Sequence, residues 1–170
     1  MISAEDWIRI LKLVPHPEGG FYREVYRSSV SVPKRALPAR FGGARALSSS
    51  IYFLLRSGEV SRFHRLKTDE IWHFYEGSPA LIHVISSEGS YHCLLLGRNV
   101  RQGELLQVIL PARTWFGAEV VRSRSYTLAG CTVAPGFDFA DFELARREDL
   151  LACFPRRRAI IERLTVPFPN

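Results

Sequence analysis

The 170-residue sequence contains no apolar run near the ~18 residues that a membrane-spanning helix needs. Its first residues are acidic and amphipathic, whereas a secretory signal begins with basic residues followed by an apolar block. Only three cysteines are present, and their spacing is not that of a metal site. We therefore expect no membrane partner and a cytoplasmic location with reduced thiols.

A disordered chain is also excluded, because hydrophobic residues make up 46% and charged residues 24% of the sequence. The length suits one domain over residues 1–170. The formal net charge is +6, but a surplus of five positive charges lies between Arg27 and Arg45, where Asp and Glu are missing. Aromatic residues do not alternate with these charges, so we expect no nucleic-acid binding. A basic loop over residues 31–46 would instead attract anionic ligands if it lies near a binding site.

The distribution of apolar residues predicts an all-β domain with short helices at both ends. Ser3 is placed to cap a first helix, which Pro15 ends. The apolar stripe of that helix is Trp7, Ile10, Leu11 and Val14. After it, aromatic and β-branched residues predict a strand within 19–29.

From residue 48 onward, short apolar runs alternate with turn residues, which is typical of a β-sandwich or barrel. After Pro135-Gly136 the pattern becomes helical, with predicted helices over 143–153 and 157–164. The predicted strands are 49–56, 60–66, 70–76, 80–87, 90–97, 106–110, 114–121 and 125–134.

The most informative segment runs from Gly58 to Gly77, where a glycine is followed by five residues and His64, and Glu70 is followed by six residues and a glycine. This pattern resembles the first motif of the cupin superfamily, a group of small jelly-roll β-barrels also described as double-stranded β-helices. In those proteins two histidines and the glutamate point into the barrel and bind a metal. A second cupin motif, ending in a further histidine, falls between Gly103 and Phe116.

Two of the four expected ligand positions are apolar in this chain, Leu66 and Phe116. His64 and Glu70 alone do not make the three or four protein ligands of a usual transition-metal site. We therefore expect no metal cofactor; if a divalent metal does bind, these two residues are its ligands. Arg113 replaces a motif glycine, at a position where a left-handed conformation would strain a larger residue.

Further segments narrow the resemblance to one cupin family of largely unassigned function, whose relatives include dTDP-sugar epimerases. The resemblance covers nearly the whole chain and implies a jelly-roll core over about 20–134, a C-terminal helical segment over 143–164 and a homodimer. It supplies no reaction. The segments that carry it are PHPEGGFYREVYRS (15–28), SIYFLL (50–55), SRFHRLKTDEIWHFYEG (61–77), LPARTWFGAEV (110–120) and GCTVAPGFDFADFELA (130–145).

Within the barrel, His64 and Glu70 are the predicted catalytic residues. A histidine oriented by a carboxylate can act as a general base without a metal. The acid that such a reaction needs is left open among Tyr52, Tyr75 and Tyr126. Aromatic rings would stack on a sugar or planar ring, and an arginine would bind an anionic group. The predicted ligand-binding residues are Arg23, Tyr52, Arg62, Trp72, Phe74, Trp115 and Phe116.

Other titratable residues are interpreted as structural. Cys131 is expected in the core, His16 and Glu18 in a turn, and Asp138, Asp141 and Glu143 at the start of a helix. The remaining histidines, His73, His83 and His92, are expected in packing or surface positions.

Three functions stay open. The first is a metal-independent isomerase or epimerase that acts on a sugar-like or nucleotide-linked substrate, with His64 as base and Glu70 either orienting it or holding a substrate hydroxyl. The second is a non-catalytic module that binds or senses a small polar or anionic ligand, and the third is a metal-dependent cupin enzyme. The sequence does not decide whether the protein is an enzyme.

Overall fold

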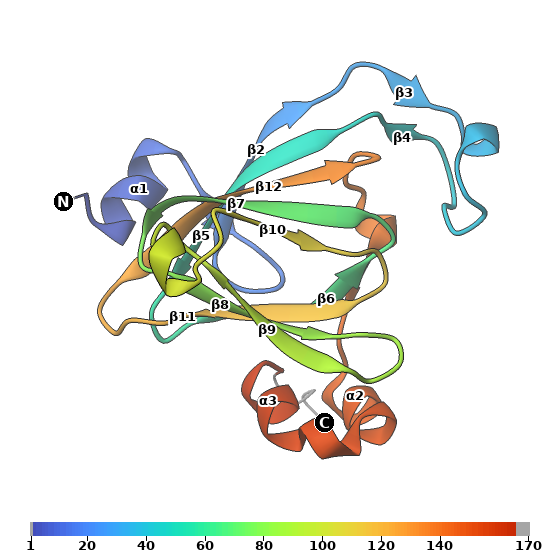
Figure 1. The fold of residues 1–170 in the computed structure, drawn as a ribbon. Helices are drawn as coiled ribbons and strands as arrows, with labels where there is room; N and C mark the ends of the chain where they lie inside the picture. Colours follow the sequence, from blue (N-terminus) through green and yellow to red (C-terminus); the bar gives the residue numbers. More distant parts are fainter. Residues whose placement is uncertain (1, 166–170) are drawn as a thin grey trace.

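A computed structural model describes residues 2–165 of the chain. Two antiparallel sheets lie face to face, with short helices near both chain ends (Figure 1). The α-helices are α1 Ala4–Ile10, α2 Arg147–Cys153 and α3 Arg158–Arg163, and the 3-10 helices are η1 Lys34–Ala36, η2 Val100–Gln102, η3 Phe139–Asp141 and η4 Pro155–Arg157. The strands are β1 Val14–Pro15, β2 Phe21–Arg27, β3 Ser31–Val32, β4 Arg45–Ala46, β5 Ser49–Arg56, β6 Val60–Leu66, β7 Asp69–Gly77, β8 Ala80–Ile85, β9 Tyr91–Leu96, β10 Gln107–Leu110, β11 Trp115–Val120, β12 Tyr126–Ala134 and β13 Phe142–Leu144.

The topology is that of a cupin jelly roll, which confirms the predicted fold class. One sheet has the order β1-β2-β5-β12-β7-β10 and the other the order β13-β6-β11-β8-β9, while β3 and β4 pair with each other. The two sheets stay separate rather than closing into one barrel. All eight strands predicted from residue 48 onward are present, each within two residues of its expected ends.

The predicted helix over 143–153 begins four residues late. Phe142 and Leu144 are half-buried and Glu143 is exposed, so this stretch has the alternation of a strand. It forms β13, which pairs with β6, and α2 starts only at Arg147. The loop over 31–46 also contains structure, because β3, η1 and β4 form an arm that projects from the sandwich (Figure 1).

The first helix is capped as expected, since Ser3 Oγ accepts a hydrogen bond from the backbone N–H of Asp6. Its predicted apolar stripe is partly wrong. Ile10 is 53% and Val14 52% exposed, because the helix ends at Ile10 and Val14 lies in β1. The buried side of the helix is Ala4, Trp7, Ile8 and Leu11.

Two apolar clusters fix the position of the functional site. The larger one fills part of the space between the sheets and includes Phe53, Trp72 and Phe116. The other lies between the five-stranded sheet and the C-terminal helices, where Phe63 packs with Ile161. No helix within residues 2–165 is both long and apolar enough to span a bilayer.

Two arginines that the sequence analysis singled out, Arg45 of the basic segment and Arg113 of the second cupin motif, have defined environments in the fold. Arg45 is buried and donates to both carboxylate oxygens of Asp141, at 2.6 and 2.8 Å, so Asp141 is an ion-pair partner rather than a helix cap. Burial favours a higher pKa for Asp141, but the hydrogen bonds and charges of Arg45 and Lys67 outweigh it and lower that pKa. Arg113 does adopt a left-handed conformation, with φ of 68°, and its backbone N–H donates to Leu66 at 2.7 Å.

Candidate functional site

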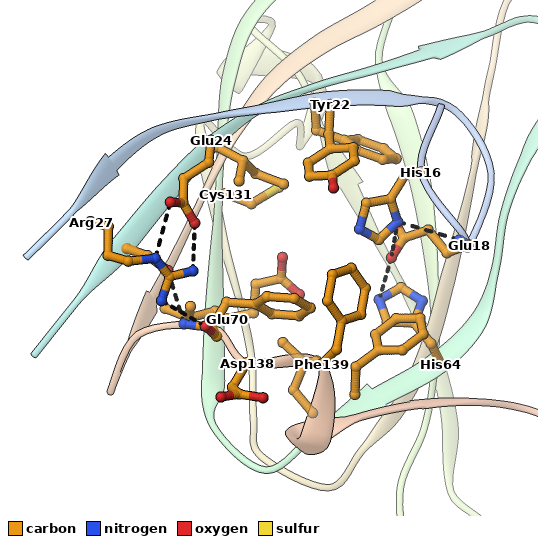
Figure 2. A pocket seen from close by; sticks show the side chains of 17 residues that line it. His16, Glu18, Tyr22, Glu24, Arg27, His64, Glu70, Cys131, Asp138 and Phe139 are labelled. Carbon is orange, nitrogen blue, oxygen red and sulfur yellow. Dashed lines mark hydrogen bonds and ion pairs between the residues drawn. The ribbon is translucent and has the colours of Figure 1, made fainter. Parts of the chain in front are cut away.

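A cavity of about 550 Å³ lies between the two sheets (Figure 2). His64 enters it from β6 of the five-stranded sheet, and Glu70 enters from β7 of the six-stranded sheet. The loop before β2 supplies His16 and Glu18. The segment after β12 covers the cavity with Phe137, Phe139 and Phe142. The predicted catalytic residues therefore lie on opposite walls of one cavity.

The loop before β2 reaches the cavity because of two glycines. Gly19 has φ of 113°, and a Cβ there would lie 2.2 Å from the carbonyl oxygen of Val60. Gly20 is similarly close to the backbone of Leu54. Since only glycine permits this approach, the loop lies against β5 and β6 and turns Glu18 inward, where it is 5% exposed. His16 and Glu18 do lie in a turn, as predicted, and that turn also places both of them in the cavity lining.

Arg62 holds this loop from outside. Its backbone N–H donates to the carbonyl oxygen of Glu18 at 2.8 Å, and its Nε donates to the same oxygen at 3.2 Å. Its Nη2 donates to the carbonyl oxygen of Pro17. Arg62 does not line the cavity, so the structure gives it a positioning role in place of the predicted ligand contact.

The hydrogen bonds around Glu18 require a shared proton. Glu18 Oε2 lies 3.2 Å from His64 Nε2 and 3.3 Å from His16 Nδ1. His64 Nδ1 must carry a hydrogen, because its partner at 2.7 Å is the carbonyl oxygen of Arg62, which only accepts. His16 Nδ1 accepts from the backbone N–H of Glu18 at 3.3 Å. If both rings were neutral and Glu18 were ionised, the lone pairs of His16 Nδ1 and His64 Nε2 would both face a negative oxygen. A proton must therefore lie on Glu18 or on one of the two rings.

Burial sets the direction of every pKa in this group. Desolvation raises the pKa of Glu18, although His16, Ser61 and Arg62 oppose it. Desolvation also lowers the pKa of His16 and of His64, which disfavours charged rings. The proton is therefore best placed on Glu18, between two neutral imidazoles.

Glu70 is the second buried carboxyl group of the cavity. Burial raises its pKa to about 7, with a further increase from Glu18 and a decrease from His64. The neighbouring Cys131 thiol has a pKa well above its usual value, because it is buried and near both carboxyl groups. Glu18, rather than Glu70, is the carboxylate within hydrogen-bonding distance of His64, so the predicted orienting role of Glu70 is corrected.

The other predicted ligand-binding residues lie outside the cavity lining. Trp72 and Phe116 are core residues, and the Phe116 ring packs on His64 with 4.1 Å between centroids. Trp115 lies in the cluster beneath the C-terminal helices, and Phe74 lies beside Arg98. Arg23 and Tyr52 contact each other, with 6.0 Å between the guanidinium carbon and the ring centroid.

The phenol of the cavity is Tyr22, which the sequence analysis did not select. Figure 2 shows its hydroxyl directed into the open space. Tyr52 and Tyr75 pack against one another, with 6.1 Å between their ring centroids. Tyr126 bonds to Trp7 Nε1 at 2.9 Å, so its hydroxyl serves the fold.

Charged groups at the other end of the cavity pair among themselves. Arg27 Nη2 donates to Glu24 at 2.6 Å, and Arg27 Nη1 donates to the carbonyl oxygen of Phe137 at 2.9 Å. Asp138 also lines the cavity there. The lining holds four carboxyl groups, Glu18, Glu24, Glu70 and Asp138, against a single arginine. This balance disfavours the anionic ligands that the basic loop led us to consider.

Comparison with known proteins agrees with the fold and with the motifs. Residues 5–145 match the profile of a family described as Cupin superfamily (DUF985). The chain belongs to this cupin family. It is 44% identical to a protein from Shewanella oneidensis of known X-ray structure, with a TM-score of 0.88 over 98% of this chain and 99% of that one. A hypothetical protein from Leishmania major is 37% identical, with a TM-score of 0.87 over 96% and 98% of the two chains. An uncharacterized protein of Saccharomyces cerevisiae is 25% identical over 159 residues, which is 88% of this chain and 78% of that protein.

The metal site that the cupin fold implies does not fit the residues of this cupin. Leu66 and Phe116 carry no donor atoms, and Glu18 occupies the remaining nitrogen of His64. Within residues 2–165, no group of three His, Cys, Asp or Glu side chains is arranged to hold a metal ion. The donor set instead forms a proton-sharing cluster.

Sequence reasoning interpreted His16 and Glu18 only as turn residues, and on the strand after them it selected Arg23 instead of its neighbour Tyr22. One feature pointed to them: titratable residues between two prolines and a Gly-Gly pair, in PHPEGG, immediately before an aromatic strand. Adjacent glycines mark a close backbone approach. Residues beside such an approach are fixed in position, and here they are fixed in the cavity.

Proposed function

We propose that this cupin is a metal-independent acid–base enzyme that isomerises or epimerises a small, neutral, sugar-like molecule. The observation that carries the proposal is the pair of buried carboxyl groups in one cavity, each next to a histidine or facing one across the open space. A pKa near 7 lets a group both accept and donate protons at neutral pH.

The reaction we propose is a proton transfer at a carbon beside a carbonyl group. Ionised Glu70 removes the proton from one face of that carbon, and the electron pair of the C–H bond moves to the carbonyl oxygen. A proton from the Glu18–His64 pair then adds to the opposite face, and the electron pair returns. Glu70 lies on the six-stranded sheet, whereas the donating pair includes His64 on the five-stranded sheet, so acceptor and donor can face opposite sides of one carbon, as inversion requires.

The remaining cavity residues suit the same chemistry. The Tyr22 hydroxyl is the donor best placed to stabilise the oxygen that becomes negative. The rings of Phe53, Phe139 and Phe142 supply apolar walls on which a sugar ring can stack. Arg62 positions Glu18 through the loop backbone without contacting substrate.

The charge of the lining favours a neutral substrate. Glu24 and Arg27 neutralise each other, and Asp138 and ionised Glu70 would repel a phosphate or carboxylate. Of the positive charges in the basic segment, those of Arg27 and Arg45 are in ion pairs, and Arg40 donates to the carbonyl oxygen of Lys67. Polar, uncharged sugars therefore fit better than the nucleotide-linked ones.

Incubation in heavy water tests the proposal. The full-length protein is mixed with a panel of aldoses and ketoses, and deuterium incorporation at carbon is followed by NMR. We expect incorporation into at least one sugar, with a decrease of at least about 100-fold in Glu70→Gln and in His64→Gln. Glu76→Gln, at an exposed position on the same strand as Glu70, is the matched control and should retain the full rate.

Each other outcome contradicts the proposal in a distinct way. Sugar binding without deuterium exchange would support the binding or sensing module. Exchange that requires an added divalent metal would support the metal-dependent enzyme. Exchange that survives in both variants, or a panel with neither binding nor exchange, would reject the proposed residues or the proposed substrate class.

The homodimer that the family resemblance implies also stays a proposal. Tyr75 and Ile109 are exposed apolar residues on β7 and β10 of the six-stranded sheet and are compatible with a sheet-to-sheet contact. Sedimentation of the full-length chain tests it, and a monomer at micromolar concentration would reject it.

A further inference from the structure

A second cluster of reactive side chains lies outside the cavity, on the five-stranded sheet. His83 is on β8, Tyr91 and Cys93 are on β9, and Glu119 is on β11. Tyr91 Oη lies 2.7 Å from His83 Nδ1, and Cys93 Sγ lies 3.1 Å from Tyr91 Oη and 3.5 Å from His83 Nδ1. Glu119 Oε1 lies 3.2 Å from His83 Nε2.

The donor and the acceptor of each hydrogen bond in this series can be assigned by starting at Glu119. Carboxylate oxygens only accept hydrogen bonds, and Glu119 is also in an ion pair with Arg163, whose Nη2 lies 2.5 Å from Oε2. His83 Nε2 is therefore a donor, and in a neutral ring Nδ1 is then an acceptor. Tyr91 donates to Nδ1, which leaves its oxygen free to accept from the Cys93 thiol. The chain thus leads from the thiol of Cys93 to the imidazole of His83.

We propose that Cys93 is the nucleophile of a second reactive site, which exchanges reversibly with small disulfides. As Cys93 Sγ attacks one sulfur of the disulfide, its proton passes to Tyr91 Oη and the Tyr91 proton passes to His83 Nδ1. A new S–S bond forms, the S–S bond of the reagent breaks, and the leaving thiolate takes the proton back from His83. One disulfide and one thiol are consumed, and one of each is produced.

Two neighbouring charged groups act on this relay. Burial and the charge of Arg163 lower the pKa of His83, whereas the hydrogen bond and charge of Glu119 raise it, so Glu119 is the group that supports the imidazolium form. The guanidinium carbon of Arg157 lies 5.2 Å from the ring centroid of Tyr91, where it favours negative charge on the relay. Cys93 is exposed, so a reagent can reach the sulfur. A nucleophile, a base and a group that orients the base form the arrangement of activated cysteines.

The other two cysteines provide internal comparisons. Cys153 on α2 is also exposed, but none of the described side chains forms such a relay with it. Cys131 is buried in the cavity wall beside Glu70. The rate at Cys93 relative to Cys153, measured in the same molecule, therefore reports the relay and not exposure alone.

The test uses the full-length protein and 2-hydroxyethyl disulfide, a small neutral reagent, at pH 7. Samples are quenched with acid, and the modified fraction of each cysteine peptide is measured by mass spectrometry. We expect Cys93 to react at least about tenfold faster than Cys153, because the relay accepts the thiol proton as the sulfur attacks. Tyr91→Phe and His83→Gln should each bring the Cys93 rate to within about twofold of the Cys153 rate.

Equal rates at Cys93 and Cys153 in the unmodified protein would overturn the proposal, as would a Cys93 rate that neither variant lowers. Circular dichroism checks that the variants fold. If they do not, Glu119→Gln removes the orienting charge with little change in shape, and an unchanged Cys93 rate in that variant would also reject the relay. Glu70→Gln should leave the Cys93 rate unchanged, which separates this site from the proposed function of the cavity.

Discussion

The cavity and the outer face of the five-stranded sheet each hold a histidine against a carboxyl group, but their protons are arranged differently. In the cavity, Glu18 lies between two imidazoles, and no Arg or Lys side chain of the described chain donates to its carboxyl group. On the outer face, Glu119 contacts both His83 and Arg163. The cavity pair thus has no arginine or lysine at its carboxyl group within the described residues, whereas the outer pair has Arg163.

The presence or absence of this arginine decides how the carboxyl group and the histidine share their protons. A carboxylate in an ion pair with a guanidinium accepts a hydrogen bond from its histidine and so fixes the tautomer of that ring, as in the Cys93 relay. A buried carboxyl group without such a partner retains a proton, because burial raises its pKa. The same two residue types therefore give a base oriented by a charge in one region and a shared proton in the other.

The largest effect we expect comes from Glu70→Gln. The pKa of Glu70 is raised to about 7 in the folded protein, so the folded state holds a proton that the unfolded chain releases above its pKa near 4.5. Wild-type stability is therefore lost as the pH rises from about 4.5 to 7, and the glutamine variant avoids this loss. Measured by urea unfolding, the free energy of unfolding of the variant relative to wild type should rise by about 2–3 kcal/mol between pH 4.5 and 8.

Glu76→Gln is the control for this measurement, because Glu76 lies on the same strand with an exposed side chain paired to Arg98. Its relative stability should change by less than about 0.5 kcal/mol over the same pH range. If the free energy of unfolding of Glu70→Gln relative to wild type did not change with pH, Glu70 would be ionised in the folded protein without penalty. The contrast between the two regions would then be lost.

His64→Gln should give a smaller effect of opposite direction in pH. Burial lowers the pKa of His64, so on acidification the unfolded chain takes up a proton that the folded state resists. Wild-type stability therefore falls below pH 6.5, and the variant should lose about 1–2 kcal/mol less between pH 7 and 5. Urea unfolding at both values measures this. An equal loss in both proteins would mean that the pKa of His64 is the same in the folded and the unfolded state.

Glu119→Gln tests the outer cluster by the same method. The amide keeps the shape but loses the charge that pairs with Arg163 and orients His83, so we expect a loss of about 1 kcal/mol at pH 7. The sign is opposite to that of Glu70→Gln at high pH. Stabilisation by Glu119→Gln would show that the outer carboxyl group, like the inner one, is held at a cost.

The sequence predicted the strands of this fold well because each strand has its own apolar alternation and turn residues. It failed at Phe142–Leu144, where three residues are too few for a periodic pattern, and pairing with β6 decides the conformation. It also missed the Arg45–Asp141 ion pair, which joins residues 96 positions apart. Only the tertiary fold brings such partners together.

The candidate site was also predictable only in part, because some of its residues lie in regular strands and others are placed by tertiary contacts. His64 and Glu70 lie in strands whose register the cupin motif fixes, and both line the cavity. Glu18 comes from a loop whose path depends on Gly19 against Val60, and no periodicity reports that contact. Alternation correctly placed Trp72 on the same face as Glu70, between the sheets, but Trp72 belongs to the apolar core beside the cavity and not to the cavity lining.

The smallest effect concerns Cys93→Ser. Cys93 is exposed on β9 and ends the relay that begins at Glu119, so its sulfur contributes reactivity and not packing. We expect its free energy of unfolding to lie within about 0.5 kcal/mol of wild type, since surface substitutions away from structural contacts are nearly neutral. Urea unfolding at pH 7 checks this, with Cys153→Ser as the second exposed thiol. A large loss in Cys93→Ser alone would mean that the outer cluster, like Arg45 and Asp141, exists to hold the fold together, and its proton order would then be a consequence of stability rather than a basis for chemistry.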